Sequence, residues 1–153
     1  MREEKVTINI IKWLESNGWT IICYDYPQSG TGIMIHPNSN TNENIKEKNK
    51  GAIIPDIIAV KDSTAVFLEN KDRFVLSDFE KIIMIKQSDL YNEGLNNLLK
   101  DYRVQNIYYG IGLPNNEKDI SKSMKYIDNI DFLVSTNDNG DIYINYEAEK
   151  IFD

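Results

Sequence analysis

The sequence contains a single cysteine and a single histidine. One cysteine cannot form an internal disulfide, and Cys23 lies in the apolar run of residues 19–23, which favours a buried structural thiol over a nucleophile. His36 lies alone in a long polar segment, which is typical of a solvent-exposed side chain rather than a general base. This scarcity excludes zinc-finger and thiol-protease functions.

Long hydrophobic runs are also missing. No stretch approaches the roughly 18 consecutive apolar residues that a membrane-spanning helix needs. Residues 1–15 lack the continuous apolar region and the cleavage site of a signal peptide. We therefore expect a cytoplasmic protein without a membrane partner.

Positive charge is scarce as well, since 17 Lys and Arg stand against 24 Asp and Glu, for a net charge of -7. Proteins that bind nucleic acid normally use a basic face, so this balance argues against a surface that binds phosphates everywhere. The acidity is uneven: residues 115–153 hold four basic and nine acidic residues, a net of -5, which leaves -2 for residues 1–114. Carboxylates that bind a metal ion would account for part of that remainder.

Apolar residues suffice for one core, because 41% of the 153 residues are hydrophobic and this length is typical of one domain. We expect a single domain over residues 1–153. An amphipathic helix over residues 3–17, stopped by Gly18, precedes a strand over residues 19–26. The polar residues 28–51 form a loop that is long for a connection within a domain. Either it orders on substrate, or it reflects a composition rich in Asn and Ile.

The remaining pattern predicts two strand hairpins and two helical regions. Ser77 and Glu80 form a capping-box pattern that opens a helical region to about residue 102, interrupted near Gly94. Asn139-Gly140 indicates a type I′ turn in the second hairpin. The other expected elements are strands over residues 52–61, 64–71, 105–113, 132–136 and 142–146, and a short helix over residues 120–127. The fold class is therefore α/β, a mixed central sheet flanked by helices in the order α-β-β-β-α-β plus a C-terminal hairpin.

Two carboxylates fall opposite each other in the first hairpin. A two-residue turn at positions 62 and 63 pairs Lys61 with Thr64 and, by continuation, Asp56 with Glu69. Facing like charges are destabilising unless something neutralises them, as a divalent cation would. Lys71 points to the same face because side chains alternate with a period of two. Three charged residues in otherwise apolar strands need a reason, because burying an unpaired charge is costly.

Two alternatives remain open at this point. Lys71 could simply form an ion pair with Glu69 or Asp56 at a solvent-facing strand end. An odd-length turn would shift the register by one residue and place the two carboxylates on opposite faces.

The segment Ile54-Pro55-Asp56, followed thirteen residues later by Glu69-Asn70-Lys71, resembles the PD-(D/E)xK signature of restriction-endonuclease-like nucleases. The resemblance covers about residues 3–110. It implies a metal-dependent endonuclease that hydrolyses DNA phosphodiesters with Mg²⁺, for which Mn²⁺ can substitute. Asp56 and Glu69 would be metal ligands, the backbone carbonyl of Asn70 a further ligand, and Lys71 the residue that positions the attacking water.

The chain departs from the pattern of this family at two positions. Relatives carry an apolar residue between the Glu and the Lys, whereas Asn70 is polar and needs buried hydrogen-bond partners. Resolvase-like relatives place an acidic metal ligand on the first helix, where this chain has Thr7. Glu3 and Glu4 lie one turn earlier, and we carry Glu4 as a candidate metal ligand.

The same resemblance admits three functions: a DNA endonuclease of restriction or defence type, a Holliday-junction or repair nuclease, and a non-catalytic interaction protein. Two-stranded cutting needs two active sites, which favours a homodimer or a larger nuclease assembly. Arg73, Lys81 and Lys86 are placed for a groove that binds the DNA backbone. Tyr108 and Tyr109 could stack on bases, although one of them should belong to the core.

Overall fold

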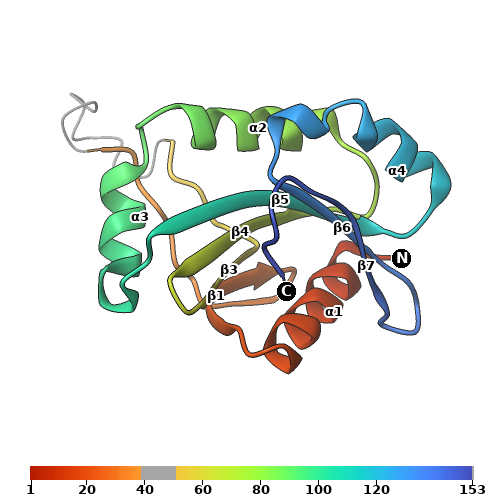
Figure 1. The fold of residues 1–153 in the computed structure, drawn as a ribbon, viewed down its shortest axis with the longest axis horizontal. Helices are drawn as coiled ribbons and strands as arrows, with labels where there is room; N and C mark the ends of the chain where they lie inside the picture. Colours follow the sequence, from red (N-terminus) through yellow and green to blue (C-terminus); the bar gives the residue numbers. More distant parts are fainter. Residues whose placement is uncertain (39–50, 153) are drawn as a thin grey trace.

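The computed structural model describes residues 1–38 and 51–152, which form a seven-stranded sheet with helices on both faces. α1 covers one face, and α2, α3 and α4 lie on the other (Figure 1). The helices are α1 (Glu3–Ser16), α2 (Leu76–Gln87), α3 (Asn92–Leu99) and α4 (Glu117–Met124), with 3₁₀ turns at Lys100–Tyr102 and Ile127–Asn129. The strands are β1 (Thr20–Tyr26), β2 (Ser29–Gly30), β3 (Ile57–Lys61), β4 (Thr64–Asn70), β5 (Asn106–Pro114), β6 (Phe132–Thr136) and β7 (Ile142–Glu147).

The sheet has the order β2-β1-β3-β4-β5-β6-β7 and is mostly antiparallel. Only the pairs β4–β5 and β5–β6 are parallel, and helices connect them across the sheet face. The predicted α/β class with a mixed sheet flanked by helices is confirmed. No helix among the residues of the two described ranges is long and apolar enough to cross a membrane.

The first hairpin has the predicted register. Lys61 pairs with Thr64, and the ladder continues to Ile57 opposite Leu68. The turn between them has two residues, and Asp62 there has a positive φ of 54°. One further step along the ladder puts Asp56 opposite Glu69, so the alternative of a shifted register is excluded.

Two hydrophobic clusters fill the space between the layers. Alternate residues of β3 point to opposite clusters: Ile57 contributes to the one under α1 and Ile58 to the one under α2. Burying a large aliphatic or aromatic side chain contributes roughly 1.5–3 kcal/mol. α2 is therefore fixed on the sheet by the apolar residues of one face, Phe79, Ile82 and Ile85. This packing leaves the polar residues at the start of α2 above the ends of the strands.

The capping-box prediction is wrong. α2 begins at Leu76, its N-cap is Val75, and no side chain caps it. The helical region is interrupted between Gln87 and Asn92 rather than at Gly94, which lies inside α3. Gly94 is needed there for a close approach, because a Cβ at this position would lie 2.7 Å from Ile35 Cγ2.

The type I′ turn is also absent from the second hairpin. That turn requires positive φ at both central residues, but of Asn139 and Gly140 only Gly140 has it, at 85°. Residues 137–141 instead form a five-residue connection held by Asn137, whose Oδ1 accepts from the backbone N–H groups of Asn139 and Asp141. The short polar side chain takes over the role of a tight backbone turn.

Of the predicted polar loop over residues 28–51, the structure describes residues 28–38 and 51. Ser29–Gly30 forms β2, and the buried Ile35 bridges to Ile53. The central part, residues 39–50, lies outside the described residues. The expectation that this loop orders on substrate concerns mostly these residues and stays a prediction.

Candidate active site

Asp56 and Glu69 meet where β3 begins and β4 ends, on the face of the sheet that α2 covers. Their carboxyl groups interact directly. Asp56 Oδ2 also accepts a hydrogen bond of 2.7 Å from the backbone N–H of Asn70. The hairpin thus brings together the two carboxylates that its register predicts.

The environment of the pair favours the protonated form of its carboxyls. The pKa of Asp56 is raised to about 8, mainly by burial. The charge of the neighbouring Glu69 acts in the same direction, and the hydrogen bond from the Asn70 N–H opposes the shift. Burial also raises the pKa of Glu69, and the ammonium group of Lys81 counteracts this. A divalent cation that binds between the half-buried carboxyl of Asp56 and the buried carboxyl of Glu69 would displace such a proton.

Lys81 of α2 is the lysine in contact with this pair. Its Nζ lies 2.9 Å from Glu69 Oε1. That oxygen is buried and has no hydrogen-bond partner of good geometry, so the contact is an ion pair rather than an aligned hydrogen bond. The Glu69 side chain is 5% exposed and that of Lys81 31%, so the carboxylate is fixed in the protein while the lysine reaches it from the surface.

Lys71 takes a different partner from the one expected. Its Nζ lies 3.3 Å from Glu3 Oε1. Burial lowers the pKa of Lys71, but the attraction of Asp78, Glu3 and Asp56 together outweighs it, so the pKa is raised. Lys71 is therefore held as an ammonium ion, which can donate a hydrogen bond but cannot accept a proton.

Asp78, in the first turn of α2, is the third carboxyl of this region. It is 7% exposed, and its Oδ2 has no hydrogen-bond partner. Burial raises its pKa to about 6, while Lys71 lowers it. Asp78 and Lys81 are three residues apart on one helix and so share a face, which explains why both act on the strand residues. This spacing can be read from the sequence, but the packing of α2 on the sheet is what turns the two side chains toward β4.

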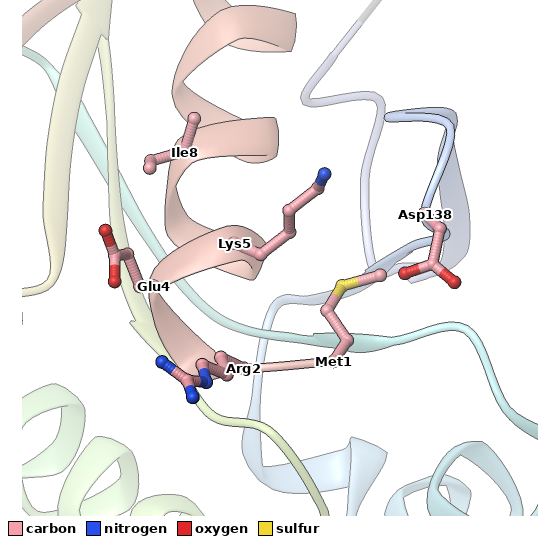
Figure 2. Close-up of a pocket in the computed structure, with 6 residues that line it drawn as sticks. All are labelled: Met1, Arg2, Glu4, Lys5, Ile8 and Asp138. Carbon is pink, nitrogen blue, oxygen red and sulfur yellow. The ribbon is translucent and has the colours of Figure 1, made fainter.

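The first helix contributes Glu3 and not Glu4 to this region. Thr7 faces β4, and Glu3 lies four residues earlier on the same helix face. Glu4 lines a pocket of about 370 Å³, together with Asp138 from the β6–β7 connection (Figure 2). Glu3 is therefore the acidic residue of this helix that contacts the site, through Lys71, while metal binding by Glu4 stays a prediction.

The two departures from the family pattern contact each other. Asn70 is fully buried, and its Nδ2 donates a hydrogen bond of 3.1 Å to Thr7 Oγ1. Its Oδ1 packs against Gly112 of β5, where any side chain would overlap it. A polar residue is thus accommodated between the Glu and the Lys because Thr7 is its partner. The contact ties the end of β4 to α1.

Other residues considered from the sequence lie away from the pair. Arg73 pairs with the adjacent Asp72, and Lys86 pairs with Asp131 at 2.6 Å. Tyr109 packs in the core against Phe67, as expected for one of the two tyrosines. Two further residues match their expected environments: His36 is exposed, and Cys23 is buried, which raises the pKa of its thiol to about 11.

Comparisons of this chain with protein-family models, curated proteins and solved structures found no match. Among residues 1–38 and 51–152, no three His, Cys, Asp or Glu side chains form a ready-made metal-binding group. The candidate site therefore consists of the Asp56–Glu69 pair and the two lysines beside it.

Proposed function

We propose that the protein is a metal-dependent nuclease of the restriction-endonuclease-like class that hydrolyses DNA phosphodiester bonds, of restriction or defence type. One observation carries the proposal: the half-buried carboxyl of Asp56 faces the buried carboxyl of Glu69, whose Oε1 forms an ion pair with Lys81 but no aligned hydrogen bond. Burying such a pair costs several kcal/mol without a cation. We therefore expect the fold to retain this pair because it binds a cation there.

The residues present fit Mg²⁺, with Mn²⁺ as a substitute. Magnesium binds through one or two carboxylates and completes its coordination with waters and substrate phosphate oxygens, so a pair suffices. Asp56 and Glu69 would be these ligands, and the backbone carbonyl of Asn70 a further one. Among the described residues, no group of three His, Cys, Asp or Glu side chains of the kind that binds zinc is formed at the pair.

Each residue of the site would have a separate role in hydrolysis. A bound divalent ion supplies charge stabilisation and activates water for attack on phosphorus. Asp56 would bind the ion as a carboxylate, and its proton would pass to solvent. Lys71, held as an ammonium ion by Glu3 and Asp78, donates a hydrogen bond that orients the attacking water. The Asn70 N–H fixes Asp56 through the strand backbone.

A non-catalytic interaction protein is the second candidate. Lys81 already pairs with Glu69 and Lys71 with Glu3, so the charges are partly neutralised without a metal ion. In that case the whole cluster would be a structural ion-pair network, and no divalent cation would bind.

The test is incubation of the purified, tag-free protein with plasmid DNA and Mg²⁺ or Mn²⁺. We expect nicks or double-strand breaks that EDTA abolishes and that Asp56→Asn does not produce. Double-strand breaks would also support the homodimer or larger assembly that we propose for two-stranded cutting. Inactivity on duplex, single-stranded and branched DNA and on RNA would favour the interaction protein. Activity on branched DNA alone would favour the junction or repair nuclease.

A further inference from the structure

The site holds two lysines with different partners. Lys71, from the motif on β4, is bound by Glu3 at the end of α1. Lys81, from α2, is the lysine that contacts a carboxylate of the Asp56–Glu69 pair. The lysine of the sequence motif is therefore not the one that neutralises Glu69 in this structure.

Lys81 and a divalent cation compete for the same atom. Glu69 Oε1 is buried, and the ammonium group lies 2.9 Å from it. A metal ion on this oxygen would lie against that ammonium group, and two cations at such a separation repel strongly in a partly buried site. Metal binding at Glu69 Oε1 therefore requires Lys81 to leave.

The Lys81 side chain can leave without disturbing the fold. It is 31% exposed, and only its ammonium end reaches the carboxylate. Its helix is fixed independently by Phe79, Ile82 and Ile85. The flexible stem can swing the charge outward into solvent, where it would be available to a polyanionic substrate.

We propose that Lys81 is a substrate-phosphate-binding residue that Glu69 holds in the metal-free protein and releases to the DNA backbone when the cation takes Glu69. This inference rests on the proposed nuclease function. Lys81 then has two states: it pairs with Glu69 in the metal-free protein, and its ammonium group binds a non-bridging phosphate oxygen when the metal site is occupied. Lys81 would thus make phosphate binding depend on metal loading.

Lys86 provides a matched control on the same helix. Its side chain is 34% exposed, and its Nζ lies 2.6 Å from Asp131 Oδ1. Asp131 in turn accepts a hydrogen bond from the backbone N–H of Tyr109, in the middle of β5 and away from the pair. Lys86→Gln therefore removes an equivalent α2 ion pair without touching Glu69.

The first measurement is metal affinity without DNA, by calorimetry with Mn²⁺ at pH 8.5. We expect Lys81→Gln to bind Mn²⁺ about threefold or more tighter than the wild type, because a competing positive charge is gone. Lys86→Gln and Lys81→Arg should not bind more tightly. Unchanged or weaker binding by a folded Lys81→Gln would overturn the proposal, since Lys81 would then not compete with the cation for Glu69.

The second measurement is the salt dependence of cleavage. A lost phosphate contact should raise KM for Lys81→Gln and reduce the slope of log KM against log salt by about 1, with kcat less affected. Lys81→Arg should restore both. Wild-type cleavage with an unchanged KM in Lys81→Gln would refute the role of Lys81 and leave the nuclease function intact. A wild-type protein that binds no metal would refute both proposals.

A third measurement uses the wild type, in case Lys81→Gln fails to fold. Lysines are methylated with ¹³C, and the Lys81 signal is assigned as the one missing in Lys81→Arg. Addition of Mg²⁺ should shift the Lys81 signal strongly and that of Lys86 little, and DNA should shift Lys81 again only in the presence of Mg²⁺. A Lys81 signal that stays unchanged on metal binding would contradict the release of this residue.

Discussion

Asp56→Asn should remove a large part of the pH dependence of stability between pH 6 and pH 8. The Asp56 carboxyl has an ordinary pKa of 3.8 and a folded-state pKa of about 8, raised mainly by burial. The native state therefore holds this proton more tightly than the unfolded chain. The stability that it contributes is complete below pH 3.8 and is lost as the pH rises to about 8.

The magnitude follows from the shift. Each pH unit well below the folded-state pKa costs about 1.4 kcal/mol per group, and the loss per unit becomes smaller as the pH approaches 8, so the metal-free wild type should lose about 2 kcal/mol from Asp56 between pH 6 and pH 8. With a typical urea dependence for a chain of this size, the unfolding midpoint should fall by about 1 M. Asp78 contributes little there, because its pKa of about 6 confines its own loss to lower pH.

Asparagine at position 56 cannot ionise, yet it keeps an oxygen that can accept from the Asn70 N–H. The variant should therefore lose about 2 kcal/mol less than the wild type over this window. The assay is urea unfolding in EDTA at pH 6 and 8, followed by fluorescence of Trp13 and Trp19, which pack against Phe152. Mg²⁺ at 100 times its Kd should restore about 2.7 kcal/mol to the wild type at pH 8.

Asp138→Asn is the control, because Asp138 is an exposed carboxyl in the β6–β7 connection and should leave the pH dependence as in the wild type. The reasoning would be refuted if the wild type and Asp56→Asn showed parallel pH profiles. It would also be refuted if the substitution destabilised the protein at both pH values, which would identify Asp56 as a structural ion-pair partner.

Two further substitutions test the site, each through a different property. Glu69→Ala should lose both Mn²⁺ binding and cleavage, whereas Lys71→Ala should lose cleavage and still bind Mn²⁺ in calorimetry; equal loss of metal affinity in both would contradict the assigned roles. Gly112→Ala should lower the free energy of unfolding by about 1–3 kcal/mol, because the new Cβ overlaps Asn70 Oδ1. A Gly112→Ala variant as stable as the wild type in urea would show that β4 and β5 can separate at no cost.

The hairpin could be predicted from sequence because its determinants are local. Apolar residues flank a two-residue polar turn, and such a turn fixes the register of both strands. Once Lys61 is opposite Thr64, the position of Asp56 opposite Glu69 follows. The second hairpin was predicted for the same reason, although its turn was not, because Asn137 uses its side chain to make the connection.

The contribution of the helices could not be obtained in this way. The contact of Lys81 with Glu69 depends on how α2 crosses the sheet, which its tertiary packing determines. Glu3 is an intermediate case. The helical period places it on the face of Thr7, so the preference for Glu3 over Glu4 was contained in the sequence once Thr7 was assigned to β4. That assignment needed the structure.

The contact between Thr7 and Asn70 explains why α1 has no acidic residue at position 7. A carboxylate at position 7 would lie against the buried amide of Asn70, on the α1 side of the sheet, and not beside Asp56 on the α2 side. The hydrogen bond between these neutral groups gives Asn70 Nδ2 a buried partner without charge, whereas an acid there would need a cation of its own. The acidic group of α1 therefore lies one turn earlier, at Glu3. There it reaches the end of β4 and holds Lys71, and the neutralisation of Glu69 is left to Lys81.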